Sequence, residues 1–349
     1  MLIVLGNSLA PTLRNYFRDC ADRTDQRIQL LPASIGKFVS SEAFSEIKAL
    51  PADIQGQSVT VIQSLAAVDD HSANDFVMQL FLTVRTLKRN GSGPVWVVMP
   101  FAAYGRQDKT SPTRMTSVAI DDLGFLLKQA GAVGVSTIEM HSDAGIQFLK
   151  SHFSKSRVYD LDPTDLYADD IRQLHSRSED ILVGGPDAGA NHRADAIAQA
   201  LRAQKFSFTK QHVGVNETAV TSFEGDVTGK TTVTIDDMID TGGTIENSQV
   251  ILERHGAQRR YVYGAHGVFS QGGLHRLFTA KAAADGGPLI TQLIVTDSID
   301  ISAKLSELRR QYGDENVTGR IRQIAAGPML LEHIKSDISC HPAMNPGAP

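Results

Sequence analysis

The chain has 349 residues, of which 42% are hydrophobic and 21% charged, so it can bury a large core, and its length indicates two domains of roughly 150 residues each. Its formal net charge of -5 argues against a nucleic acid or an anionic membrane as a partner held by bulk charge. No stretch approaches the roughly 18 apolar residues of a membrane helix, so we expect no membrane partner. Cys20 and Cys340 form neither a CxxC pair nor a disulfide framework, which favours a reducing, cytoplasmic location.

Short apolar runs alternate with longer amphipathic stretches along the whole chain. In the first half this rhythm predicts strands over 2–5, 59–62, 95–99 and 135–139, and helices up to about residue 22, over 74–88 and over 117–130, with a short turn or helix at 146–148. Residues 151–177 are rich in Asp, Ser and Arg and predict a connection that carries one short helix. In the second half we predict strands over 181–184, 205–209, 231–235 and 260–266, a last strand over 293–296, helices over 192–203 and 244–255, and a loose tail over 337–349.

This repeated alternation predicts an α/β protein made of two tandem domains, each with a largely parallel sheet flanked by helices. We place an N-terminal α/β domain at 1–155, a C-terminal α/β domain at 156–305, and a C-terminal helix with its tail at 306–349.

The sharpest motif lies at 234–244, which reads Thr-Ile-Asp-Asp-Met-Ile-Asp-Thr-Gly-Gly-Thr. A buried strand ends there in two carboxylates and runs into a glycine turn that opens a helix. The N-terminus of a helix offers backbone N–H groups and a favourable dipole to a phosphate, and adjacent Asp side chains accept hydrogen bonds from sugar hydroxyls. The pattern favours a phosphorylated sugar as ligand over the alternative of an ordinary helix cap with acidic surface residues.

This run resembles the phosphoribosyl diphosphate (PRPP) binding loop of phosphoribosyltransferases and ribose-phosphate diphosphokinases. Further stretches resemble the diphosphokinase family, also called PRPP synthetases: Pro100 to Lys109 with its Arg-Gln-Asp motif, Glu139-Met140-His141-Ser142 with Gly145 to Phe148, Gly185-Pro186-Asp187-Ala188-Gly189, and Gly264 to Ser270. The similarity covers roughly residues 1–300. It implies two phosphoribosyltransferase-like domains that bind ATP on the N-terminal side and ribose 5-phosphate on the C-terminal side.

The resemblance also implies a role for each matching residue. The residues expected to bind ATP are Phe38, Ser40, Ser41, Glu42, Arg106 and Gln107, and those expected to bind ribose 5-phosphate are Asp236, Asp237, Asp240, Thr241, Gly242, Gly243 and Thr244. His141 and Asp187 are expected to contact Mg²⁺. Lys210 and His212 are the expected catalytic residues, which would assist the transfer of the diphosphoryl group. Because the family supplies the loop that matches 38–42 from a neighbouring subunit, a homo-oligomer is expected.

Some positions depart from the family pattern. The basic pair Lys-x-Arg reads Lys210-Gln211-His212, and the loop Phe-x-Asp-Gly-Glu reads Phe38-Val39-Ser40-Ser41-Glu42. An imidazole that is mostly neutral at pH 7 replaces a guanidinium fork in the first motif.

These departures leave alternatives beside the diphosphokinase. One is a regulatory or sugar-phosphate-binding subunit with weakened catalysis, and another is a related enzyme that acts on a different sugar phosphate or nucleotide. A phosphoribosyltransferase would explain the loop at 234–244 but not the duplicated halves or the motifs at 106–108 and 139–141.

Overall fold

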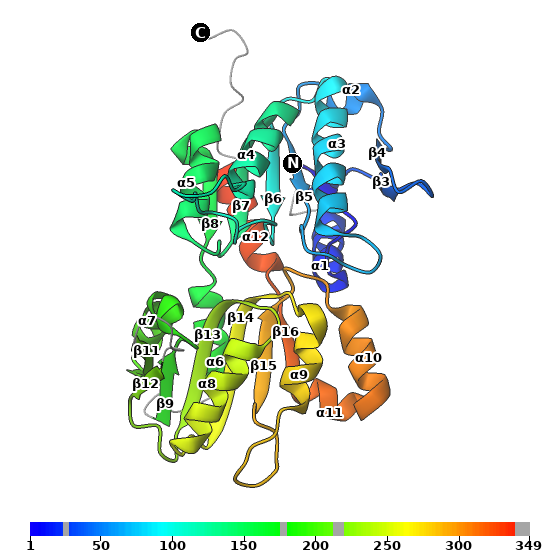
Figure 1. The fold of residues 1–349 in the computed structure, drawn as a ribbon. Coiled ribbons are helices and arrows are strands. Elements are labelled where there is room, and N and C mark those ends of the chain that lie inside the picture. The colour runs from blue at the N-terminus through cyan, green and yellow to red at the C-terminus, as the bar shows by residue number, and fades with distance from the viewer. Residues whose placement is uncertain (24–27, 175–179, 212–219, 339–349) are drawn as a thin grey trace. The chain divides into compact units, whose positions relative to one another are not determined.

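The computed structural model describes residues 1–23, 28–174, 180–211 and 220–338, with the backbone alone for 209–211 and 220–222. The chain forms two compact units (Figure 1). The first unit comprises Met1–Leu161, Asp297–Ile301 and the segment from Ala325 onward, and the second comprises Asp162–Thr296 and Ser302–Ile324. Each unit is described separately below.

The first unit is built on a six-stranded parallel sheet with the strand order β2-β1-β5-β6-β7-β8. Its strands are β1 Leu2–Leu5, β2 Gln29–Leu30, β5 Val59–Ile62, β6 Val95–Met99, β7 Ala132–Ile138 and β8 Val158–Leu161. Its helices are α1 Pro11–Asp22, α2 Pro51–Ile54, α3 Ala73–Arg89, α4 Ala119–Ala130, α5 Asp143–His152 and α12 Gly327–His333, with shorter turns η1 Lys155–Arg157 and η5 Ile334–Ile338. An antiparallel hairpin of β3 Ala33–Lys37 and β4 Ala43–Ile47 packs against α3.

Both faces of this sheet are covered, as the continuous apolar runs of its central strands require. Along β6, Val95, Val97 and Met99 join a core with α3, α4 and α5, whereas Trp96 and Val98 join a second core with α1 and α12. Strand alternation therefore sends successive side chains into opposite cores. The C-terminal helix α12 belongs to the second of these cores through Leu330 and Leu331.

The second unit repeats the architecture with a six-stranded parallel sheet of order β10-β9-β13-β14-β15-β16. Its sheet strands are β9 Ile181–Gly184, β10 Gln204–Lys205, β13 Thr231–Ile239, β14 Arg259–Gly267, β15 Gln292–Thr296 and β16 Ile321–Ile324, and an antiparallel pair is formed by β11 Ser207–Gln211 and β12 Val220–Glu224. Its helices are α6 Thr164–Leu174, α7 Asn191–Leu201, α8 Gly243–Arg254, α9 Gly273–Thr279, α10 Ser302–Tyr312 and α11 Asp314–Thr318, with short turns η3 Ala188–Ala190 and η4 Ser270–Gly272. Val183 and Ile235 pack against α6 and α7 on one face, and Leu182 packs with Leu252 of α8 on the other.

The predicted fold class is confirmed: two largely parallel sheets, each flanked by helices. Some details of the sequence-based prediction were wrong. The single strand predicted over 205–209 is divided between β10 of the six-stranded sheet and β11 of the antiparallel pair. The stretch 151–177 contains the edge strand β8 as well as helix α6, and 293–296 is not the last strand, because β16 pairs in parallel with β15. Of the loose tail expected at 337–349, Asp337 and Ile338 close the turn η5, and the remainder lies outside the described residues.

Within the described ranges, no helix combines the length and apolarity needed to cross a membrane. Each unit carries its own six-stranded sheet. Arg106, Gln107, His141, Asp187 and the stretch 236–244 fall at or after the carboxyl ends of the strands of these sheets, where α/β sheets commonly bind ligands. Residues 38–42 instead join the strands of one two-stranded sheet, and Lys210 lies in the other.

Candidate active site

In the first unit, neighbouring strands place Arg106, Gln107 and His141. Arg106 and Gln107 follow β6, His141 follows β7, and these two strands pair in parallel, so the two loops leave the same edge of the sheet. All three residues are exposed. The structure therefore brings Arg106 and Gln107, two of the residues expected to bind ATP, to the same edge of the sheet as His141, the histidine expected to contact Mg²⁺.

The two loops are joined by a hydrogen bond that the sequence analysis did not identify. Ser142 Oγ donates to Asp108 Oδ2, and Asp108 is only 4% exposed. Ser142 also caps α5 by accepting a 3.1 Å hydrogen bond from the N–H of Gly145. A Cβ at Gly105 would lie 3.1 Å from Met140 Sδ, so the loops pack closely beneath the exposed residues. The hydrogen bond between Ser142 and Asp108 thus ties the two loops together.

Residues 38–42 form the turn that joins β3 to β4. The N–H of Phe38 donates a 2.9 Å hydrogen bond to the carbonyl oxygen of Glu42, and Ser40 Oγ donates a 2.7 Å hydrogen bond to Glu42 Oε2. Ser41 takes a left-handed conformation with φ of 67°. The tip is exposed, since Phe38 retains 59% of its accessible surface and Val39 is fully accessible. Figure 1 shows this hairpin beside α3 with its tip directed outward from the first unit.

In the second unit, β13 ends in the carboxylate pair Asp236 and Asp237. The N–H of Asp237 donates a 3.0 Å hydrogen bond to Asp236 Oδ1, and Arg193 Nη1 of α7 lies 3.8 Å from Asp237 Oδ1. Burial is the largest cause that raises the pKa of Asp236 well above its usual value, and the charges of Asp237 and Asp187 raise it further. Like charges are gathered here, which suits a site that receives hydroxyl donors or a cation.

The turn that follows this pair, residues 240–244, requires glycine at position 242. Gly242 has φ of 81°, and a Cβ there would lie 2.9 Å from Leu277 Cγ. Asp240 is held in place because Ser270 donates to its Oδ1 from both the backbone N–H, at 3.2 Å, and the hydroxyl group. Thr241 and Thr244 are exposed beside the first turn of α8. The turn thus stands at the N-terminus of α8, where backbone N–H groups and the helix dipole favour a phosphate.

Asp187 lies in the turn after β9, the strand next to β13. Its Oδ1 accepts a 2.8 Å hydrogen bond from the N–H of Gly189. It also borders a pocket of about 180 Å³ whose walls come from this turn, from β11 and from α8: Pro186, Asp187, Ala188, Phe208, Thr244, Asn247, Ser248 and Ile251. The pocket therefore lies between the turn at 185–189 and the first turn of α8.

Lys210 lies in β11, opposite Thr221 of β12, and its backbone alone is described. His212 lies outside the described residues. Their roles in transfer stay predictions from the sequence.

The donor chemistry in the second unit fits Mg²⁺. Carboxylate oxygens are hard ligands, and Mg²⁺ is commonly held by one or two carboxylates, several waters and substrate phosphates. Across the residues whose placement is described, no three His, Cys, Asp or Glu side chains are grouped to hold a metal ion by themselves. Asp187 and Asp236 are close enough for the charge of Asp187 to raise the pKa of Asp236, which is the repulsion that a cation relieves.

The sequence analysis did not identify several other residues of the candidate site. Ser270 stands at the end of the stretch 264–270, so that motif could have indicated it, whereas Arg193 reaches Asp237 from a helix with no motif that signals it. Asn247, Ser248 and Phe208 became visible only as walls of the pocket.

Comparison with known proteins agrees with this architecture. Residues 7–131 match the family described as the N-terminal domain of ribose phosphate pyrophosphokinase, and residues 189–317 match the phosphoribosyl synthetase-associated domain. The chain is 31% identical over 309 residues to the ribose-phosphate pyrophosphokinase of Granulibacter bethesdensis, covering 88% of this chain and 89% of that protein. It is 29% identical over 338 residues to the enzyme of the same name from Caulobacter vibrioides, covering 96% of each. The crystal structure of phosphoribosylpyrophosphate synthetase from Mycobacterium smegmatis matches with a TM-score of 0.77 at 24% identity, over 97% of this chain and 99% of that one.

The fold is that of a two-domain protein of the phosphoribosyltransferase-like class. The identity and coverage go further: the chain belongs to the ribose-phosphate pyrophosphokinase family, an enzyme family of transferases. The resemblance inferred from the sequence motifs is thereby confirmed.

Proposed function

We propose that this protein is a ribose-phosphate diphosphokinase, which transfers the diphosphoryl group of ATP to the 1-hydroxyl of ribose 5-phosphate and yields PRPP and AMP. The observation that carries this proposal is the second unit's site in a chain of this family: paired carboxylates, a glycine turn at the start of α8, and Asp187 beside them.

In the second unit, Asp236 and Asp237 would accept hydrogen bonds from the ribose hydroxyls. The turn from Asp240 to Thr244, including Thr241, Gly242 and Gly243, would hold the 5-phosphate through backbone N–H groups and hydroxyls. The Ser270 contact that fixes Asp240 supports this role, because it sets the turn before any ligand arrives.

In the first unit, Arg106 and Gln107 would bind ATP. A planar guanidinium can grip a phosphate through two hydrogen bonds or stack on adenine, and an amide can hydrogen-bond beside it. Asp108 and Ser142 would keep this loop in register with His141.

Asp187 and His141 are the residues we propose to contact Mg²⁺, with Asp187 as the direct oxygen ligand and His141 acting through water. When bound, Mg²⁺ would neutralise part of the phosphate charge during transfer. In the transfer step, the anomeric oxygen attacks the β-phosphorus in line and its hydroxyl proton passes to solvent. The bond from that phosphorus to the oxygen shared with the α-phosphate breaks, and AMP leaves. Lys210, with His212 nearby in sequence, would offset the charge that builds on the β-phosphate.

The exposed tip at 38–42 supports a homo-oligomer, in which Phe38, Ser40, Ser41 and Glu42 reach the ATP of a neighbouring subunit. A cytoplasmic location and the lack of nucleic-acid or membrane partners remain proposals that rest on composition.

The test is AMP release from ATP and Mg²⁺ with and without ribose 5-phosphate. We expect AMP only when the sugar phosphate is present, and a loss of at least about 10²-fold in Lys210→Ala. ATP binding without turnover in the native chain would contradict the proposal and favour the regulatory subunit. In that case a gain of turnover in His212→Arg would locate the loss at the second basic position.

A further inference from the structure

The hairpin of β3 and β4 is small, so its contacts with the rest of the first unit must determine its orientation. It is a two-stranded sheet of its own, separate from the six-stranded sheet of the first unit. Such a hairpin is marginally stable alone in water, so its ties to the rest of the fold decide where its tip lies. One tie is on β4, where Ser45 Oγ and Thr83 Oγ1 of α3 are 2.8 Å apart.

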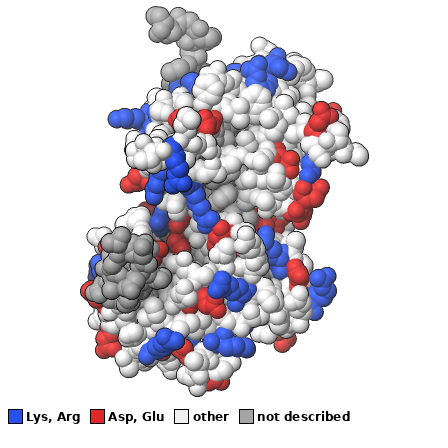
Figure 2. Space-filling view, in the orientation of Figure 1, with Lys and Arg blue, Asp and Glu red and all other residues white. Residues whose placement is uncertain are grey.

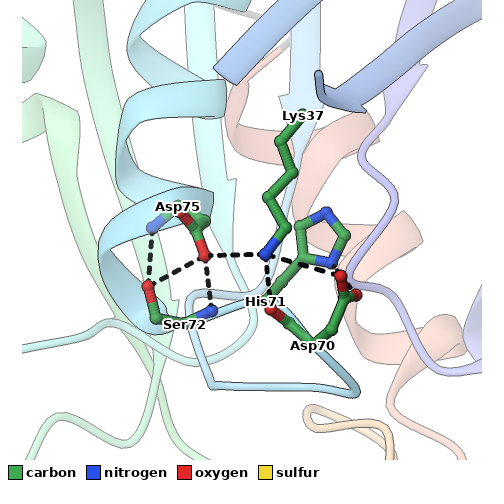
Figure 3. A network of polar contacts seen from close by, with 5 residues as sticks. All are labelled: Lys37, Asp70, His71, Ser72 and Asp75. Atoms are coloured by element: carbon green, nitrogen blue, oxygen red, sulfur yellow. Dashed lines mark hydrogen bonds and ion pairs between the residues drawn. The ribbon is translucent and has the colours of Figure 1, made fainter. Parts of the chain in front are cut away.

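The second tie is Lys37, the last residue of β3 and the residue directly before Phe38 (Figure 3). Its Nζ donates to the backbone carbonyl oxygen of Asp70 and lies 3.5 Å from Asp70 Oδ2 and 3.5 Å from Asp75 Oδ2. The Lys37 side chain is only 16% exposed, although the tip that follows it is open to solvent. A long, flexible side chain is thus held at its charged end by three oxygen atoms.

The acceptors of this ammonium group are themselves fixed at the start of α3. The N–H of Ser72 donates a 2.7 Å hydrogen bond to Asp75 Oδ2, and the N–H of Asp75 donates one of 3.2 Å to Ser72 Oγ, which makes a capping box. His71 Nδ1 lies 2.8 Å from Asp70 Oδ1, and its ring stacks on Phe76 at 5.3 Å. The hydrogen bonds from Ser72 are the largest cause that lowers the pKa of Asp75, and Lys37 lowers it further, so this carboxylate is ionised when it meets the lysine.

We propose that Lys37 is a positioning residue for ATP: by tying β3 to Asp70 and Asp75 at the start of α3, it sets where the tip at 38–42 meets the nucleotide. The inference rests on the proposed function, which gives the tip its ligand. Since Lys37 and Phe38 are covalently adjacent, a shift of the lysine moves the tip directly. Because the tip would contact ATP away from the bond that breaks, its misplacement should weaken ATP binding rather than slow the chemical step at saturating ATP.

The experiment measures both the dissociation constant for ATP at equilibrium and the steady-state constants of the full-length protein. In Lys37→Met we expect the dissociation constant and the KM for ATP to rise about tenfold, with the KM for ribose 5-phosphate unchanged and kcat at saturating ATP within about twofold. Lys37→Arg, which keeps the charge and the reach, should restore ATP binding. A merely structural role would lower Tm without this selective effect on ATP.

The matched control is Lys48→Met, which removes an exposed lysine just beyond β4 on the same hairpin and should leave ATP binding unchanged. Asp75→Asn tests the partner: combined with Lys37→Met it should weaken ATP binding by less than the product of the two single effects. Unchanged ATP affinity in Lys37→Met, or loss equal to that in Lys48→Met, would overturn the inference even if the native enzyme makes PRPP. If the native chain binds no ATP, the inference also fails, whereas ATP binding without sugar-dependent AMP release contradicts only the proposed function.

Discussion

The backbone N–H of Asp237 donates a hydrogen bond of 3.0 Å to Oδ1 of Asp236, and this contact orients the Asp236 carboxyl group at the end of β13. The pair is asymmetric. Asp237 lies 3.8 Å from the guanidinium of Arg193, whereas burial and the neighbouring carboxylates disfavour the ionised form of Asp236. A site that gathers such charges before its ligand arrives sacrifices stability for binding.

Asp236→Asn should therefore stabilise the ligand-free protein but abolish most of its PRPP synthesis. Because the pKa of Asp236 is raised in the folded state, the folded chain binds more protons than the unfolded chain, and the free energy of unfolding falls as pH rises above about 4. At pH 7.5 without Mg²⁺ or substrate we expect the variant to gain on the order of 1 kcal/mol, about 2–4 °C in Tm, and to lose at least about 10²-fold in PRPP synthesis. Thermal unfolding at pH 4 and pH 7.5 checks this, with the exposed Asp195→Asn as control, and an unchanged Tm at pH 7.5 would refute it.

Gly242→Ala should damage both the fold and the binding of ribose 5-phosphate. A left-handed φ of 81° costs an alanine about 1–2 kcal/mol, and its Cβ would also press on Leu277. Gly229→Ala is the matched control, since Gly229 has φ of 71° with nothing within 4 Å of an added Cβ. Urea unfolding should show a loss in both variants, while calorimetry should show at least about tenfold weaker ribose 5-phosphate binding in Gly242→Ala alone. Equal binding in both variants would argue against a phosphate at this turn.

Arg106→Lys tests whether a fork of N–H donors is needed. A lysine keeps the charge and loses the paired hydrogen bonds, so we expect the KM for ATP to rise about tenfold or more with little change in the KM for ribose 5-phosphate. Arg89→Lys at the exposed C-terminal end of α3 should change neither constant. Steady-state kinetics with each substrate varied in turn gives the comparison, and an equal rise in both KM values would remove Arg106 from the nucleotide side.

His333 should make the first unit sensitive to acid. It is buried between Ser136 Oγ, 2.8 Å from its Nε2, and Asp337 Oδ2, 2.8 Å from its Nδ1. Burial lowers the pKa of His333, although Asp337 acts to raise it, so the folded state binds fewer protons than the unfolded state. Stability should thus be lost as pH falls below about 6.5 towards the lowered folded pKa.

Urea unfolding at pH 7.5 and pH 5.5 measures this loss. His333→Leu should lower stability at pH 7.5, by about 1–3 kcal/mol for the buried hydroxyl of Ser136 left unpaired, and should lose less stability than the native chain between the two pH values. The exposed His275→Leu should keep the native pH dependence. A native pH dependence in His333→Leu would show that another group titrates.

The sequence predicted the buried, central strands of both sheets and missed their edges. Strands β5, β6 and β9 are continuous apolar runs buried on both faces, and these were predicted. The edge strands β8 and β16 mix polar with apolar residues, as in Ile-Arg-Gln-Ile of β16, where Arg322 pairs with Asp170. The sequence pattern of such short strands does not distinguish them from loops, because they form through pairing with a neighbouring strand.

The residues of the candidate site also fall into a group that the sequence could predict and a group that it could not. Residues in contiguous motifs, such as Asp236 to Thr244, could be predicted because one turn holds them together. Arg193 and Lys37 could not, because each acts on residues distant in the sequence, Asp237 in one case and Asp70 and Asp75 in the other. Figure 2 shows Lys and Arg side chains spread over the face in view, whereas the side chains of Lys37 and Arg193 are only 16% and 12% exposed.

The most direct test of the central claim is the product ratio followed by phosphorus NMR in a mixture of the native protein, ATP, Mg²⁺ and ribose 5-phosphate. The account predicts that AMP and PRPP appear in equal amounts and that neither forms when the sugar phosphate is omitted. Formation of ADP and inorganic phosphate in their place, or of no product at all by a protein that binds ATP, would contradict it.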